Sequence, residues 1–286
     1  MSFVGKLERV IDSMPSLPIT VSKIIELTNN PQSTPSDLNK VITLDPVLTA
    51  KVLKLVNSAY YNLSNSVTSI VKAIVLLGLN TIKNLAISTA VLGTVKKKVT
   101  EDAINMDGFW RHCLAVGVTS RSIATKIGID PKLREEFFIA GMLHDIGKVV
   151  LNDHFPLPFL HAIQVADSQR VSLWRAEAVT FEYDHIRTGK LIAEKWQLSQ
   201  NLAEAISFHH MPMEASEQNR RLVTAVAAAD IFCVENGTGF AGSFVPDQFT
   251  EENWKILGIH EEDLSGIEKT INEEIEKASV FLAINT

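Results

Sequence analysis

Residues that could ligate a metal ion are concentrated in the second part of the sequence. All eight histidines follow residue 111, and His144 stands next to Asp145 within an otherwise apolar run, 137–151. Asp230 lies in a second apolar run, 222–234. Because burying an ionised carboxylate without a partner costs several kcal/mol, Asp145 and Asp230 should each face a cation, a cluster of donors or water.

Imidazole nitrogens and carboxylate oxygens suit zinc, iron, manganese, cobalt or nickel, and require no cysteine ligand. Adjacent residues on a helix project about 100° apart, so His144 and Asp145 can border a pocket wide enough for two ions, with the carboxylate bridging them. Two such ions would polarise a phosphoryl oxygen and generate hydroxide from a shared water, which is hydrolytic chemistry. Lys148, one helical turn after Asp145, would hold a phosphate oxygen or the nucleophilic water.

Each of these residues also has a purely structural interpretation. A single histidine on a helix most often packs in the core or lies at the surface, and we apply this interpretation to His154, His161 and His260. A buried aspartate more often bonds to backbone or arginine than to metal. Cys113 and Cys233 lie in apolar stretches and are expected to be reduced core thiols.

The spacing of apolar residues is helical nearly everywhere and predicts an all-α protein, a multi-helix bundle. A capping side chain precedes a proline at Thr34-Pro35, Asp45-Pro46 and Asp130-Pro131. These pairs predict helix starts near residues 35, 46 and 131.

Two apolar faces follow from the same spacing. One consists of Val47, Leu48, Val52, Leu55 and Val56, and the other of Ile70, Val71, Ile74, Val75 and Leu77 before Gly78 ends the helix. The stretch 235–249 has little pattern and predicts a loop, followed by one amphipathic helix from about 261 to 283.

The segment 96–107, basic and then acidic, predicts a boundary between an N-terminal helical subdomain, 1–105, and a metal-binding helical domain, 106–286. The first subdomain contains no histidine or cysteine, so a role in binding or scaffolding is its natural interpretation. Asn57, Ser58, Tyr60 and Tyr61 are candidates for contact with a partner protein, although packing of this helix end on the second half is the favoured interpretation.

Composition excludes several classes of protein. At 286 residues and 46% hydrophobic content, the chain can bury a substantial core. The net charge of -6 disfavours general nucleic-acid binding, and the basic run Lys96 to Lys98 is too short to change this. No apolar run reaches the roughly 18 residues of a membrane span, and the start lacks a signal-peptide core, so we expect a cytoplasmic protein without a membrane partner.

Two sets of motifs resemble known families. The ordered set His112, His144-Asp145, Lys148, His185, His209-His210 and Asp230 resembles the metal signature of HD-superfamily phosphohydrolases, in the fuller form of the HD-GYP phosphodiesterases. The first half resembles the HDOD (HD-related output domain) pattern at Leu17-Pro18, Asp45-Pro46, 54–61 and 69–78, and the likeness continues at 109–112 and 184–189.

The resemblance implies a bacterial, all-helical signalling protein with an HDOD subdomain and an HD-type domain. It also implies that His112, His144, Asp145, His185, His209, His210 and Asp230 surround one or two divalent metal ions, with Asp145 bridging and Lys148 assisting. Two departures from the family pattern limit which activities the resemblance implies. No Gly-Tyr-Pro segment follows His210, so hydrolysis of cyclic di-GMP is not implied, and Gly108 stands where three-metal members place a glutamate, so a third ion is not expected.

Three functions follow as expectations. The first is a metal-dependent phosphohydrolase that acts on a nucleotide or cyclic-nucleotide phosphoester, with Asp145 and Lys148 as catalytic residues. The second is a non-catalytic regulatory module that binds a signalling partner through its N-terminal half and holds a structural or sensory metal. The third, a minor alternative, is a di-iron oxygenase.

Overall fold

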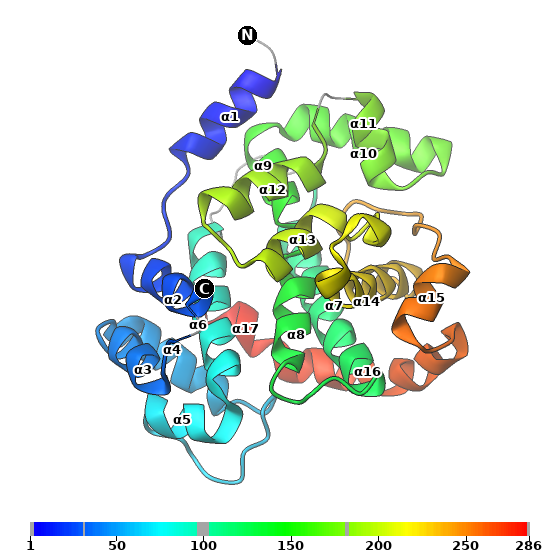
Figure 1. Ribbon diagram of the computed structural model, residues 1–286. Helices are drawn as coiled ribbons and strands as arrows, with labels where there is room; N and C mark the ends of the chain where they lie inside the picture. The colour runs from blue at the N-terminus through cyan, green and yellow to red at the C-terminus, as the bar shows by residue number, and fades with distance from the viewer. Residues whose placement is uncertain (1–2, 31, 96–102, 181–182, 285–286) are drawn as a thin grey trace.

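The computed structural model describes residues 3–30, 32–95, 103–180 and 183–284. Helices account for all of the regular secondary structure in these ranges, which confirms the all-α prediction (Figure 1). The N-terminal helices are α1 Phe3–Ser13, α2 Ile19–Asn29, α3 Pro35–Thr43, α4 Pro46–Val56, α5 Ile70–Leu77 and α6 Leu79–Val95.

The second half continues with helices that cross one another around α7 and α14 (Figure 1). These helices are α7 Met106–Lys126, α8 Arg134–Leu143, α9 Ile146–His154, α10 Pro156–Gln169, α11 Leu173–Thr180, α12 His185–Lys195, α13 Gln200–Phe208, α14 Glu217–Glu235, α15 Glu251–Leu257, α16 Ser265–Ala278 and α17 Val280–Ala283. Short 3-10 turns lie at Pro212–Glu214 and Glu261–Leu264.

Two of the three predicted helix starts are confirmed by their caps. Thr34 and Asp37 form a reciprocal capping box at α3, and Asp45 Oδ1 accepts a hydrogen bond of 2.9 Å from Leu48 N at α4. The start near 131 is wrong, because α8 begins at Arg134. Asp130 Oδ1 accepts from the Lys132 backbone at 2.9 Å, and this local bond makes a turn that competes with the helix.

The prediction of the two apolar helix faces is partly wrong. Val47, Val71 and Val75 are 66%, 55% and 77% exposed, whereas Leu48, Val52, Leu55 and Val56 of α4 are buried as predicted. Helix α5 buries Ile70, Ala73 and Ile74. A two-turn helix packed on one side buries a narrow stripe, so apolar residues one position away from the stripe point to solvent.

The C-terminal prediction also needs correction. The loop after α14 is present, but α15, capped by Thr250 and ended by Gly258 at φ 72°, was not predicted. The single helix expected from 261 to 283 is divided into a 3-10 turn, α16 and α17. The chain turns at Ser279, which directs α17 into the junction between the two halves, next to α6 and α8 (Figure 1).

This junction is lined by aromatic and charged side chains. The Phe281 ring of α17 lies 5.5 Å from the Tyr60 ring and 4.7 Å from the Phe138 ring. Tyr61 donates a 2.7 Å hydrogen bond to the buried Glu135, and the Arg121 guanidinium lies 4.5 Å over the Tyr60 ring. Tyr60 and Tyr61 therefore pack on the second half, in agreement with the favoured interpretation.

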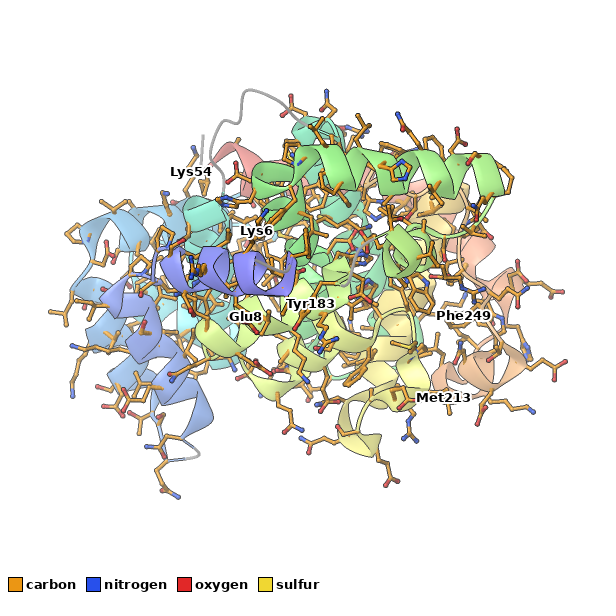
Figure 2. The ribbon with its side chains drawn as sticks, turned by 90° about the horizontal axis from the view of Figure 1, so that it is seen from above. Lys6, Glu8, Lys54, Tyr183, Met213 and Phe249 are labelled. Atoms are coloured by element: carbon orange, nitrogen blue, oxygen red, sulfur yellow. The ribbon has the colours of Figure 1, made fainter. Side chains whose placement is uncertain are left out.

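The domain boundary at 105/106 stays a prediction, because residues 96–102 of the segment that suggested it lie outside the described residues. Buried apolar side chains of the described residues form one continuous cluster that spans both halves. Helix α1 lies over the second half, where the Lys195 ammonium donates to the Asp12 carbonyl at 2.7 Å. Seen from above, Lys6 and Glu8 mark this helix, and Phe249 lies toward the opposite side of the molecule from Lys54 (Figure 2).

No single helix of the described residues has the length and hydropathy to cross a bilayer. Helices α5 and α6 reach that hydropathy only as a pair, and they are bent by 120° relative to each other.

Candidate metal centre

The predicted ligands come from six helices and converge on one buried site. His112 lies in α7, His144 and Asp145 link α8 to α9, His185 opens α12, His209 and His210 follow α13, and Asp230 lies in α14. These helices pack on one another in pairs, α7 with α8 and α14, α12 with α9 and α13, and α13 with α14. Residues separated by more than a hundred positions, such as His112 and Asp230, thus lie in one site.

Glycines allow the close approach that builds the site. A Cβ atom on Gly147 would lie 1.9 Å from the His185 carbonyl oxygen, so only glycine lets α9 contact the start of α12. A Cβ atom on Gly141 would lie 2.8 Å from the Val116 carbonyl oxygen of α7. The first contact brings Asp145 against His185, and the second holds α8, and with it His144, against α7.

Asp145 is the centre of the arrangement, and its two oxygens face different groups. Asp145 Oδ1 lies 3.4 Å from His185 Nε2 and 3.7 Å from His209 Nε2. Asp145 Oδ2 lies 3.3 Å from His144 Nε2 and 2.7 Å from the Lys148 ammonium. The two oxygens of Asp145 therefore face different ligand groups.

The ligand atoms form two groups. His112, His144 and Asp145 make the first, His185, His209 and His210 make the second, and the ligand atoms within each group lie within 4.8 Å of one another. Asp230 completes the first group, with Oδ1 at 3.0 Å from His112 Nε2 and 3.6 Å from His144 Nε2. Among the described residues, Asp230 thus pairs with histidine, whereas the structural interpretation favoured backbone or arginine.

Most of this site is sealed from solvent. The side chains of His144, Asp145, His185 and His209 are at most 1% exposed, whereas that of Asp230 is 14% exposed. His209 Nε2 and Asp145 Oδ1 are inaccessible, and within the described residues neither makes a hydrogen bond. Buried polar atoms are rarely left without a partner, and a divalent cation between these atoms would supply one.

The histidine rings present their Nε2 atoms to the site. His144 Nδ1 donates to the Gly141 carbonyl at 2.6 Å, and His209 Nδ1 donates to the carbonyls of Ala205 and Ile206 at 3.2 Å. Because a carbonyl can only accept, a hydrogen sits on Nδ1 of each ring, and Nε2 is the nitrogen that would bind a metal. The residues present therefore fit one or two ions.

The local charge also favours a cation. Burial lowers the pKa of His144, but Asp145 and Asp230 outweigh burial and raise that pKa from 6.5 to about 10. Burial opposes ionisation of Asp145, yet His144 and Lys148 hold its pKa well below the ordinary value. In the metal-free protein, a proton on His144 supplies positive charge that the carboxylates require.

His209 differs from His144 in its electrostatic environment. Burial, followed by the neighbouring His210 and His144, lowers the pKa of His209 well below its ordinary value. The ring is therefore neutral near pH 7, which is the form that ligates a metal.

Two carboxylates of the site were missed in the sequence. Glu177 of α11 accepts from His185 Nδ1 at 2.6 Å, and Asp247, in the loop after α14, accepts from His210 Nδ1 at 2.5 Å. Glu177 stands between two alanines, a signal of the kind that singled out Asp230. Asp247 lies in the stretch with little pattern, and nothing in the sequence around it points to the site.

The other side chains with a structural interpretation lie outside the two ligand groups. Cys113 and Cys233 are buried free thiols, and burial raises the pKa of Cys233 to about 12. His154, His161 and His260 are exposed. These residues take no part in the cluster.

Gly108 packs against the loop that follows α14. Its carbonyl accepts from Phe240 N at 2.9 Å, and a Cβ atom on Gly239, at φ 72°, would lie 2.3 Å from His112 N. The loop thereby covers the first turn of α7, next to His112.

The family model of the HDOD domain matches residues 14–212. The chain belongs to the HDOD family. The match ends before α14, so Asp230 and Asp247 of this HDOD protein lie outside the matched range.

Two curated relatives match parts of this HDOD protein. An uncharacterized protein of Treponema pallidum (strain Nichols) is 26% identical over 221 residues, which are 77% of this chain and 42% of the relative. Ribonuclease Y of Alkaliphilus metalliredigens (strain QYMF) is 30% identical over 118 residues, which are 41% of this chain and 18% of that protein. The chain thus spans less than half of the length of either relative.

Two solved structures have a similar fold over nearly the whole chain. An HDOD domain protein of unknown function from Geobacter sulfurreducens has a TM-score of 0.77 at 24% identity, covering 94% of each chain. A protein from Shewanella amazonensis SB2B, named "Putative phosphohydrolase", has a TM-score of 0.72 at 26% identity, covering 98% of each chain. These likenesses show the fold that the chain shares with both proteins.

Proposed function

We propose that this HDOD protein is a metal-dependent phosphohydrolase that cleaves a nucleotide or cyclic-nucleotide phosphoester at a dinuclear centre. The observation that carries the proposal is the position of Asp145, whose Oδ1 faces the cluster of His185, His209 and His210 while its Oδ2 faces His144. The name of the relative from Shewanella amazonensis SB2B supports the same chemistry.

The bound ions would be held by the two ligand groups and would supply Lewis acidity and a water of lowered pKa. The side chains of the protein provide the rest. Lys148, 2% exposed and 2.7 Å from Asp145, keeps its ammonium protonated because Asp145 and Asp230 outweigh the effect of burial and raise its pKa. This ammonium can donate a hydrogen bond to a phosphate oxygen. Asp230 is the more exposed wall of the site and marks the side from which a substrate approaches.

The test is turnover of a panel of phosphate monoesters and diesters by protein loaded separately with manganese, zinc, iron, cobalt or nickel. We expect hydrolysis by the wild type and by Asp167→Ala, a control on the exposed side of α10, and none above background by Asp145→Ala. Equal turnover by Asp145→Ala and the wild type would reject the proposal. Oxygen uptake that depends on substrate, by the iron-loaded protein alone, would support the oxygenase alternative.

A regulatory interaction module with a structural or sensory metal is the second candidate. The observation that favours it is a set of exposed apolar side chains in the N-terminal half, Ile19, Leu44, Val47, Val71, Val75 and Leu76. Such side chains are typical of contact surfaces when they are contiguous. If a signalling partner bound equally well to the wild type and to Asp145→Ala, and no panel ester were cleaved, this function would replace catalysis.

A further inference from the structure

The two ligand groups differ in the acceptors that bind the Nδ1 hydrogens of their histidines. In the three-histidine group, His185 and His210 each donate Nδ1–H to a carboxylate, that of Glu177 and that of Asp247. In the other group, His144 donates Nδ1–H to a backbone carbonyl. An imidazole that donates to a carboxylate is oriented and made more basic, so it binds a metal more strongly.

Glu177 holds His185 at two points. Its Oε2 accepts from the ring Nδ1 at 2.6 Å and from the backbone N of His185 at 2.9 Å, and the carboxylate is fully buried. The second bond also joins α11 to the first residue of α12. The ring of His185 therefore has one tautomer and one direction, with Nε2 toward the site.

Asp247 holds His210 together with Trp174. Trp174 Nε1 donates to Asp247 Oδ1 at 2.9 Å, and the Trp174 ring stacks on the His210 ring at 5.6 Å between centroids and 16° between planes. The carboxylate and the indole thus fix the position and the plane of the imidazole. Asp247 lies beyond the matched HDOD range, so this contact belongs to the C-terminal part of the chain.

The orientations of the His185 and His210 rings place the lone pairs of their Nε2 atoms against each other. Because His185 and His210 both commit their Nδ1 hydrogens to carboxylates, their Nε2 atoms meet at 3.1 Å as two acceptors. Two acceptors at this distance require a proton or a metal ion close to them. The three-histidine group is therefore arranged for a cation.

The ligand atoms of the other group, which contains His112, His144 and Asp145, already pair with other side chains. The Lys148 ammonium lies 2.7 Å from Asp145 Oδ2, and Asp230 Oδ1 lies 3.0 Å from His112 Nε2. An ion that enters on this side must displace the ammonium from Asp145 and the proton that His112 Nε2 donates to Asp230. Both displacements cost free energy. Within the described residues, an ion among His185, His209 and His210 has no ammonium to displace, and replaces only the proton that His185 and His210 would otherwise share.

We infer that the three-histidine group is the tighter of two unequal metal positions, and that Glu177 and Asp247 are the positioning residues that make it so. The inference rests on the proposed function only in requiring that both groups take a metal. It predicts ordered loading, with the first ion among His185, His209 and His210 and the second between His144 and Asp230.

The test is titration of the metal-free protein with cobalt(II), followed by visible absorption and by calorimetry. We expect two steps in the wild type, with the first absent in His210→Ala and retained in His112→Ala. Asp247→Asn and Glu177→Gln, which keep the shape of each side chain, should weaken the first step about 10–100-fold and leave the second step unchanged. The matched control Asp167→Asn should bind as the wild type does.

Trp174→Phe separates the two contacts of the indole, because it keeps an aromatic ring and removes Nε1–H. We expect a smaller loss in the first step than in Asp247→Asn, since Asp247 still accepts from His210. If Asp247→Asn does not fold, as judged by circular dichroism, Glu177→Gln and Trp174→Phe decide the question by the same titration.

A first step that is lost in His112→Ala and kept in His210→Ala would overturn the inference. Unchanged affinity of the first step in both Asp247→Asn and Glu177→Gln would overturn it as well. The proposed function can fail separately, because ordered cobalt binding without hydrolysis of any ester would refute catalysis and leave the inference standing.

Discussion

Lys148 places its ammonium 2.7 Å from Asp145 Oδ2, on the side of that carboxylate that a second metal ion would occupy. Both side chains are almost completely buried, so this ion pair neutralises Asp145 when no metal is bound. The same ammonium would then compete with a metal ion for Asp145 Oδ2. Two measurable consequences follow for the variant that lacks it.

Lys148→Met should destabilise the metal-free protein by about 3–5 kcal/mol, because it removes the closer of the two cations, Lys148 and protonated His144, that neutralise the buried Asp145. Saturating zinc should restore most of this loss, since the metal supplies the missing charge. Urea unfolding with and without zinc measures both effects, and Lys190→Met on the exposed face of α12 is the control. An equal loss with and without zinc would mean that Lys148 does not share its place with a metal.

The metal-free protein should lose stability as the pH rises above 6.5. The pKa of His144 is lowered by burial but raised more by Asp145 and Asp230, to about 10, so the folded state holds this proton more tightly than the unfolded state. The stabilisation is fully present below the unfolded value of about 6.5 and is lost as the pH rises through about 10. Thermal unfolding between pH 6.5 and 10 checks this. The melting temperature should fall less steeply with pH in His144→Ala and in the metal-loaded wild type than in the metal-free wild type. The same pH dependence in all three proteins would refute the role of the His144 proton.

Gly147→Ala should disrupt the site without replacing a ligand side chain. The new Cβ atom would meet the His185 carbonyl at 1.9 Å, so α9 and α12 must separate, at a cost of about 1–3 kcal/mol or more. We expect lower thermal stability and weaker metal binding, measured by melting and by cobalt titration. Gly108→Ala is the matched control, because its nearest contact would be an ordinary 3.7 Å and alanine favours a helix. Wild-type metal binding by Gly147→Ala would contradict the importance of this contact.

Tyr61→Phe should destabilise the junction between the halves by about 1–3 kcal/mol, because Glu135 would lose its 2.7 Å hydrogen bond while remaining buried. The same substitution in a Glu135→Gln background should cost less, since a neutral amide is less expensive to leave unpaired. Urea unfolding of the four proteins gives the coupling energy. A coupling energy of zero would show that the hydroxyl and the carboxylate act independently.

Local chemistry made part of this protein predictable from its sequence. The caps at Thr34 and Asp45 and the stop at Gly78 depend only on neighbouring residues, so the ends that they define agree with the structure. The start near 131 was wrong because two local hydrogen-bonding patterns competed at Asp130. Val47, Val71 and Val75 were misplaced because periodicity shows that a helix has an apolar side, and only packing decides how wide the buried stripe is.

The candidate site, too, could be predicted from the sequence only in part. An aspartate in an apolar run must find a cation or a donor wherever the chain folds, so the neighbouring residues were enough to single out Asp145 and Asp230. The contacts of these two aspartates could not be predicted, because they depend on segments that meet only in the folded chain. One such meeting is the close approach of Gly147 in α9 to the His185 carbonyl. Asp247 is the clearest case. It lies in a loop without periodic pattern, 37 positions from His210, and its hydrogen bond to that ring exists only because the tertiary packing returns the loop to the site.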